Sequence, residues 1–193
     1  MCKISRLVVE FVKKSITVKF YYNLQGDHWS PVFKNFMIKS FDPIFNKNCK
    51  ILILGSCPSI KSLEQGEYYA HKQNRFWRIM FKLFGREFSA DYNLKKQMLL
   101  NNGVGLWDTI GLCERVGSLD SAITNAVPNN IPALIKNSKV KCIVLNGNKA
   151  KSMFKHKIDG VDIVCLPSTS PANAKYSFDS LFEIWQKALQ KYI

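Results

Sequence analysis

Hydroxyl, amide and carboxylate side chains gather in three short segments of this 193-residue chain. The first is GSCPS at residues 55–59, which is followed by YYAH at 68–71 and NRFW at 74–77. The second ends at Asp108, and the third is LPSTSPANA at 166–174. A strand that ends in Gly-Ser exposes backbone N–H groups and hydroxyls, which are donors and acceptors for a bound ligand. These residue types therefore favour polar recognition of a ligand.

Each segment also has a purely structural interpretation. Taken alone, GSCPS fits an ordinary connection between a strand and a helix, and an isolated Asp108 fits a turn cap. The Ser/Thr/Pro run before the last helix fits a loop and an N-cap. Asn74 could cap the helix that follows it, could serve the ligand, or could do both. Residue type alone leaves these alternatives open.

Four short apolar runs lead into these segments. The runs are rich in β-branched residues and lack alternation, which indicates strands buried on both faces of a sheet. They cover residues 50–54, 104–107, 140–145 and 161–166. Apolar residues at helical spacing follow at 76–84, with Gly85 as the stop, and at 178–189. Alternating strands and helices predict an α/β layered fold with a mainly parallel sheet.

The polar segments follow these predicted strands. GSCPS comes after the first strand, WDTIG at 107–111 after the second, NGN at 146–148 after the third, and PSTSPANA at 167–174 after the fourth. In parallel sheets of this kind, the ligand site lies beyond the carboxyl ends of the strands. We therefore expect the polar segments to meet in one site.

The order and spacing of the motifs resemble those of the uracil-DNA glycosylase superfamily. Its first motif ends a strand as G-x-x-P-x, matched here by Gly55 and Pro58. Its mismatch-specific branch continues with aromatic-Ala-His and N-x-F-W, matched at 69–71 and 74–77. GSxPS followed by YYAH and NRFW is most similar to the hypoxanthine-DNA (deoxyinosine) glycosylase branch. From about Met37 onward, the resemblance implies a three-layer α/β/α sandwich with a central, mainly parallel four-stranded sheet.

The resemblance also implies an activity and a set of site residues. The enzyme would be a monofunctional glycosylase that flips a deaminated base, most simply hypoxanthine, out of DNA and hydrolyses its N-glycosidic bond. Tyr69 would stack on the base, and Asp108 would read its Watson–Crick edge. Gly55 and Cys57 would complete the base pocket. The residues expected to contact DNA are Ser168, Thr169, Ser170, Asn173 and Arg75.

Cys57 departs from the pattern of the superfamily. It stands at the third position of the first motif, which holds or activates water in several branches as Asp, Asn or Glu. A thiol is a weak hydrogen-bonding group, so we expect Asn74 to orient the water, assisted by Ser56 or Ser59.

Asp108 is expected to select the base. An ionised Asp108 would accept a hydrogen bond from the N1–H of hypoxanthine and repel adenine. Uracil also offers a ring N–H, so Asp108 alone does not distinguish uracil from hypoxanthine.

Two other functions remain open at this point. A mismatch-specific uracil or thymine glycosylase shares the aromatic-Ala-His and NRFW motifs, although Cys57 replaces its usual Asn. A non-catalytic module that binds damaged DNA could keep the fold and lack turnover. Removing Asn74 separates these functions, because a binding module has no product formation to lose.

The composition of the chain indicates which binding partners and which cellular compartment to expect. The formal net charge of +14 suits a polyanion such as DNA, although a chain rich in Lys, Asn and Ile also fits an AT-rich genome. The six cysteines form no CxxC pair and do not match the four-cysteine arrangement of the iron–sulfur branches. We expect no metal, no cofactor and no membrane span, and a cytoplasmic monomer that acts on DNA.

Residues 1–36 fit the predicted domain less well. They carry six Lys/Arg against two Asp/Glu and show no clear period, whereas a complete α/β start follows from Met37. We expect an N-terminal extension or a start-codon artefact at 1–36, and a uracil-DNA glycosylase-like domain at 37–193.

Overall fold

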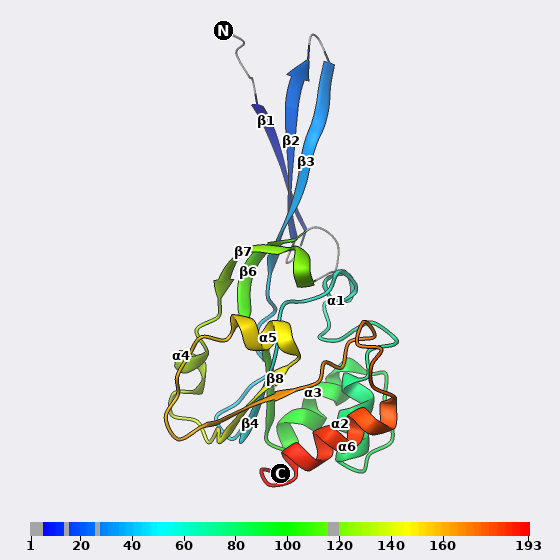
Figure 1. The fold of residues 1–193 in the computed structure, drawn as a ribbon, viewed down its shortest axis with the longest axis vertical. Coiled ribbons are helices and arrows are strands. Elements are labelled where there is room, and N and C mark those ends of the chain that lie inside the picture. The colour runs from blue at the N-terminus through cyan, green and yellow to red at the C-terminus, as the bar shows by residue number, and fades with distance from the viewer. Residues whose placement is uncertain (1–5, 14–15, 26–27, 116–119) are drawn as a thin grey trace.

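A computed structural model describes residues 6–13, 16–25, 28–115 and 120–193 (Figure 1). The strands are β1 (Arg6–Lys13), β2 (Ile16–Gln25), β3 (His28–Lys39), β4 (Ile51–Gly55), β5 (Val104–Asp108), β6 (Ile110–Arg115), β7 (Ile123–Pro128), β8 (Cys142–Asn146) and β9 (Asp162–Leu166). The helices are α1 (Ile60–Gln65), α2 (Phe76–Leu83), α3 (Tyr92–Asn101), α4 (Ile131–Ile135), α5 (Asn148–Met153) and α6 (Phe178–Leu189), with a short 3-10 turn η1 (Asp120–Ala122).

The central sheet is parallel and has the strand order β5-β4-β8-β9. Every residue of β4 and β8 is buried, which explains why their sequences show no polar alternation. The predicted four-stranded parallel sheet is confirmed. Its strands begin and end within one or two residues of the predicted bounds; the run predicted at 140–145, for example, forms a strand at Cys142–Asn146.

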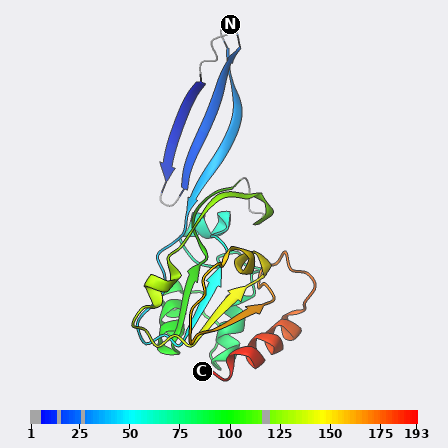
Figure 2. The same ribbon diagram turned by 60° about the vertical axis from the view of Figure 1, so that its left-hand side comes forward.

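Helices cover both faces of this sheet, which confirms the predicted three-layer sandwich (Figure 2). On one face, Ile51, Ile53 and Val144 pack with residues of α2, α3 and α6. On the other face, Leu52 and Ile143 pack with residues of α4 and α5. The sheet is thus shielded from water on both sides, and its strand ends are held in fixed positions.

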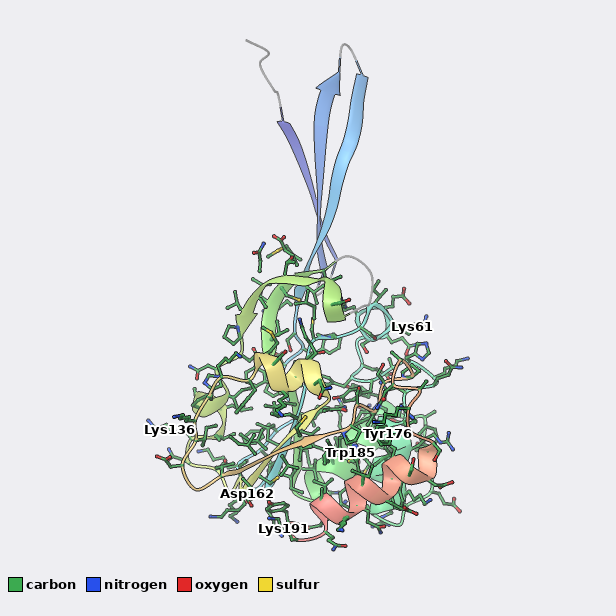
Figure 3. The ribbon with its side chains drawn as sticks, in the orientation of Figure 1. Lys61, Lys136, Asp162, Tyr176, Trp185 and Lys191 are labelled. Atoms are coloured by element: carbon green, nitrogen blue, oxygen red, sulfur yellow. The ribbon has the colours of Figure 1, made fainter. Side chains whose placement is uncertain are left out.

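The two predicted helices are present near their expected bounds. Helix α2 ends one residue earlier than predicted, and Gly85 follows it at φ 59°, a left-handed conformation that suits glycine. Helix α6 begins after Ser177, whose side chain accepts from the Ser180 N–H. Its Trp185 is fully buried (Figure 3). In the described ranges, no helix has the length and apolarity needed to span a bilayer.

The C-terminal end of the chain returns to the central sheet. Just beyond α6, Lys191 pairs with Asp162 at the start of β9 at 3.2 Å, and both are labelled at the lower edge of Figure 3. Tyr192 donates a hydrogen bond to the same carboxylate. These contacts lie at the amino ends of the parallel strands, away from the carboxyl ends where the polar motifs lie.

A second sheet was not foreseen from the sequence. It has the order β1-β2-β3-β6-β7 and is antiparallel throughout. Its first three strands project away from the sandwich in both views (Figures 1 and 2). Strand β3 runs across the expected boundary at 36/37, and residues 36–39 pair with β6. The division at 36/37 remains a prediction, and β3 is continuous across it.

Candidate active site

A cavity of about 670 Å³ opens at the carboxyl ends of the four parallel strands. This size lies in the range of small-molecule pockets. Each strand contributes its last residue: Gly55, Asp108, Asn146 and Leu166. Of the residues predicted for the site, all line this cavity except Thr169 and Arg75. The structure therefore brings together segments that are more than a hundred residues apart in the sequence.

Asp108 and Gly55 form one wall of the cavity as a matched pair. Asp108 is only 3% exposed, and its Oδ2 accepts a hydrogen bond from the Ser40 hydroxyl at 3.1 Å. A Cβ at Gly55 would lie 2.5 Å from Asp108 Oδ1 and 3.1 Å from the Tyr69 hydroxyl. Glycine is needed here for close approach, because any side chain would displace the carboxylate.

Three features hold Tyr69 at the cavity: its backbone conformation, the stacking of its ring and a hydrogen bond to its hydroxyl. Its φ of 54° is unusual for a bulky residue and indicates a locally strained turn. The ring stacks on Phe76, with centroids 4.2 Å apart. The hydroxyl accepts a hydrogen bond from Asn146 Nδ2 at 3.0 Å. A ring fixed in this way could stack on a base with little loss of side-chain entropy.

Asn146 is a site residue to which the sequence reasoning assigned no role. Besides Tyr69, its Nδ2 donates to Thr169 Oγ1, and its Oδ1 accepts from the Thr169 N–H, both at 3.0 Å. It thereby links Tyr69 of the YYAH segment to the LPSTSPANA loop at 166–174, hereafter the second motif. The position of the NGN segment at the end of the third strand was the signal that could have identified it.

The prediction that the Thr169 side chain contacts DNA is not supported by its position. The residue is fully buried, and its hydroxyl is used by Asn146. Ser168, Ser170 and Asn173 of the same loop do line the cavity. Asn173 Nδ2 donates to the Ser168 carbonyl at 2.8 Å and closes the loop on itself. Thr169 thus fixes the loop that presents its neighbours.

Arg75, which was predicted to contact DNA, donates hydrogen bonds to the second motif. Its guanidinium donates to the backbone carbonyls of Ser170 and Asn173, each at 2.8 Å, and to that of Tyr176. Its backbone N–H donates to the Thr169 carbonyl at 3.1 Å. These donors are directed at the protein's own loop, which gives Arg75 a structural role, and DNA contact by Arg75 stays a prediction.

Asn74 lines the cavity and also supports the start of α2. Its Oδ1 accepts from the Phe76 N–H at 3.0 Å, while the N-cap position itself is occupied by Arg75 without a side-chain bond. An amide oxygen has two lone pairs, so the same atom can accept a second hydrogen bond from water. The geometry is compatible with both roles that the sequence left open.

Cys57 lies at the cavity in contact with a second thiol. Its Sγ is 3.3 Å from Sγ of Cys113 on β6. The hydrogen bond with Cys113 and, next, burial raise the pKa of the Cys57 thiol well above its usual range.

Of the serines predicted to assist catalysis, Ser59 caps α1 by accepting from the Ser62 N–H at 3.1 Å, and Ser56 lines the cavity.

Two cations at the cavity were also not assigned a role from the sequence. Arg115 is 2% exposed and donates to the Pro58 carbonyl of the first motif. Lys175 follows the second motif and lines the cavity.

Across the described ranges, no three His, Cys, Asp or Glu side chains are grouped so that they could hold a metal ion. The expectation of a metal-free and cofactor-free site remains a prediction.

The parallel sheet, the cavity at its carboxyl end and the two motif loops define a class of protein. The family model of the uracil DNA glycosylase superfamily matches residues 43–190. The chain belongs to this superfamily.

Two curated relatives place it more narrowly, and both are named hypoxanthine DNA glycosylase. One, from Methanosarcina acetivorans, is 35% identical over 146 residues, which are 73% of this chain and 92% of the relative. The other, from Methanosarcina barkeri, is 30% identical over 156 residues, which are 79% of this chain and 98% of the relative. The predicted resemblance to this branch is confirmed.

A solved structure agrees with the fold. A solution NMR structure from Methanosarcina acetivorans, assigned as a uracil DNA glycosylase, has a TM-score of 0.68 and 31% sequence identity. The match covers 81% of this chain and 98% of that one.

Proposed function

We propose that this protein is a monofunctional DNA glycosylase that removes hypoxanthine from deoxyinosine in DNA and so starts base-excision repair. The superfamily and the two relatives named hypoxanthine DNA glycosylase support an enzyme that acts on deaminated bases. The observation that carries the choice of base is the Asp108 carboxylate, buried at the cavity wall with its Oδ1 over Gly55.

Base capture begins with extrusion of the nucleotide. Unpairing and unstacking cost a few kcal/mol, and least for a mispaired base. Stacking on Tyr69 offsets part of this cost, because base–aromatic stacking contributes about 1–3 kcal/mol. Ser168, Ser170 and Asn173 lie on the loop that lines the same cavity. Their small polar side chains suit contact with the DNA backbone beside the flipped nucleotide.

Asp108 supplies the discrimination between purines. An ionised carboxylate accepts a hydrogen bond from the N1–H of hypoxanthine, whereas N1 of adenine presents a lone pair to it. Adenine would therefore place an acceptor lone pair against the buried carboxylate, which is costly. Discrimination against adenine matters for such an enzyme, because adenine is the normal base from which hypoxanthine forms by deamination.

Hydrolysis replaces one bond at C1′ by another. The N9–C1′ bond breaks with its electron pair going to the base, and a water oxygen bonds to C1′ of the oxocarbenium-like sugar. The water loses a proton to solvent, and the departing base gains one. Asn74 orients this water through its carbonyl oxygen, which already accepts from the Phe76 N–H. No lysine amine is needed as a nucleophile in this scheme.

The base specificity is tested with a panel of duplexes. Hypoxanthine, uracil, xanthine or thymine is placed opposite each normal base, excess protein is added, and alkali then cleaves any abasic site. We expect cleavage at hypoxanthine and none at adenine. Cleavage at uracil or thymine but not at hypoxanthine would identify a mismatch-specific uracil or thymine glycosylase. Intact strands throughout would leave only a damage-binding module.

A further inference from the structure

Ser40 lies behind the base-reading carboxylate, outside the segment at 43–190 that the family model matches. It is 7% exposed and follows β3 directly. Its backbone N–H donates to the Gly111 carbonyl at 2.9 Å, which ties it to β6. Its hydroxyl lies 3.1 Å from Asp108 Oδ2 and 3.2 Å from the Phe41 carbonyl. One hydroxyl hydrogen therefore has two acceptors within reach.

The neighbours of Ser40 decide between these acceptors. The Phe41 carbonyl already accepts from Trp107 Nε1 at 2.9 Å and from the Tyr68 hydroxyl at 3.2 Å. A second acceptor near the Tyr68 hydroxyl, the Asp42 carbonyl, is farther away at 3.4 Å. Burial, and next the charge of Asp108, raise the pKa of Tyr68 far above its usual range, so this hydroxyl remains a donor. A carbonyl oxygen has two lone pairs, and both are engaged. The Ser40 hydrogen is thus directed to the carboxylate, which is a stronger acceptor than either the Phe41 carbonyl or the neighbouring Tyr68 hydroxyl.

This hydrogen bond limits the rotation of the Asp108 side chain. With Oδ2 held by Ser40, Oδ1 lies over Gly55, which lines the cavity. Without the hydroxyl, the carboxylate would lose one contact that limits rotation about its terminal torsion, which is soft and roughly two-fold. The oxygen that meets the base would then be less well placed.

We propose that Ser40 is a positioning residue that sets base selectivity by orienting the Asp108 carboxylate toward the N1–H of hypoxanthine. This inference rests on the proposed function. It makes selectivity depend on the segment through which the second sheet joins the sandwich, because Ser40 is held by β6 and follows β3.

The test measures binding, so that it does not depend on turnover. The probes are two duplexes with a cleavage-resistant 2′-fluoroarabino sugar at one position, carrying hypoxanthine in one and adenine in the other. The ratio of their dissociation constants is measured for the wild type, Ser40→Ala, Ser40→Thr, Asp108→Ala and the double variant Ser40→Ala/Asp108→Ala. Ser138→Ala is the matched control, because its hydroxyl also lies between a carbonyl, that of Ile135, and a second partner, the Val140 N–H, but does not line the cavity.

We expect Ser40→Ala to lower the preference for hypoxanthine about tenfold, the effect of losing one charge-assisted hydrogen bond. Ser40→Thr keeps the hydroxyl and should keep the preference, as should Ser138→Ala. In the Asp108→Ala background, Ser40→Ala should change nothing further, which a general loss of structure would not produce. If Ser40→Ala does not fold, Ser40→Cys, with its weak S–H donor, carries the same expectation.

Two results would overturn the role of Ser40. One is a wild-type preference in Ser40→Ala, and the other is an equal loss with and without Asp108. Cleavage of an unmodified hypoxanthine duplex by the wild type is measured alongside. If the wild type cleaves and the Ser40 variants keep its preference, only the role of Ser40 fails. If the wild type does not cleave, the proposed function fails independently.

Discussion

Asn74 is expected to act in two ways. Its amide oxygen accepts from the Phe76 N–H at the start of α2, and the residue lines the cavity. Substitution by alanine removes both contributions. We expect Asn74→Ala to lower the single-turnover rate on hypoxanthine DNA about 100-fold or more, and the free energy of unfolding by about 1 kcal/mol. Quenched-flow or manual time courses and urea unfolding measure the two effects.

A serine at the same position separates these two effects. Asn74→Ser keeps an acceptor that can cap α2, but its side chain is shorter and cannot reach the same water. We expect stability near that of the wild type and a rate as low as that of Asn74→Ala. Recovery of the rate together with the stability would mean that Asn74 acts only as a cap.

Cys57 is expected to be an unreactive thiol in spite of its place at the cavity. Its contact with Cys113 and its burial raise its pKa, so that little thiolate forms near neutral pH, and the thiolate is the reactive form. Cys165 lines the same cavity and is exposed. At pH 8, iodoacetamide should modify Cys57 at least about tenfold more slowly than Cys165, as measured by peptide mass spectrometry. Equal rates would show that the thiolate is accessible.

The sequence could predict which residues line the cavity, but not how they are held. The cavity members follow strands whose apolar runs are plain, so their convergence at one sheet edge is expected. The roles of Arg75 and Thr169 depend on hydrogen bonds to backbone carbonyls and to Asn146. Such partners are set by loop geometry and leave no pattern in the sequence. For the same reason, the sequence does not reveal the hydrogen bond between Ser40 and Asp108.

At the scale of elements, the start of α2 holds the second-motif loop in place. Arg75 donates to three carbonyls of residues 170–176. We expect Arg75→Ala to lower the free energy of unfolding by about 2–3 kcal/mol, because hydrogen bonds from a charged donor contribute more than neutral ones. DNA affinity should also fall, since the loop loses its fixed shape. Thermal unfolding and fluorescence anisotropy measure the two quantities.

Arg78 provides the matched control on the same helix. It is exposed, and its guanidinium lies 4.5 Å from the centre of the Phe178 ring. Such a contact at the surface contributes about 0.5–1 kcal/mol, so Arg78→Ala should be only mildly destabilising. If Arg75→Ala were no more destabilising than Arg78→Ala, the loop would not depend on Arg75.

The two sheets differ in how far their sequences reveal them. Strands of the parallel sheet are buried on both faces and read as continuous apolar runs. The antiparallel sheet joins residues 36–39 to residues 112–115, a pairing over a long sequence separation that local propensity does not encode. Strand β7 is mostly exposed or half-exposed. Its sequence therefore carries little apolar signal.

At the scale of the whole molecule, the sandwich is expected to fold without the projecting strands. The buried residues of its two larger cores lie at 44 or beyond, and a third cluster begins at Ile38, which the shortened chain retains. Truncation tolerance follows burial and hydrogen bonding of the removed backbone. A chain of residues 37–193 should therefore unfold cooperatively and excise hypoxanthine at about the wild-type rate. Circular dichroism and the alkali assay check both points. A truncated chain that is unfolded would make the projecting strands part of the domain.

The central claim is that this cavity hydrolyses the bond between hypoxanthine and deoxyribose. The most direct measurement is mass spectrometry of the small molecules released from a deoxyinosine duplex in one turnover, with abasic sites counted on the same sample. We predict free hypoxanthine equal in amount to the abasic sites, with no release by Asn74→Ala on the same time scale and none from an adenine duplex. Absence of free base with the wild type, or unchanged release by Asn74→Ala, would contradict the claim.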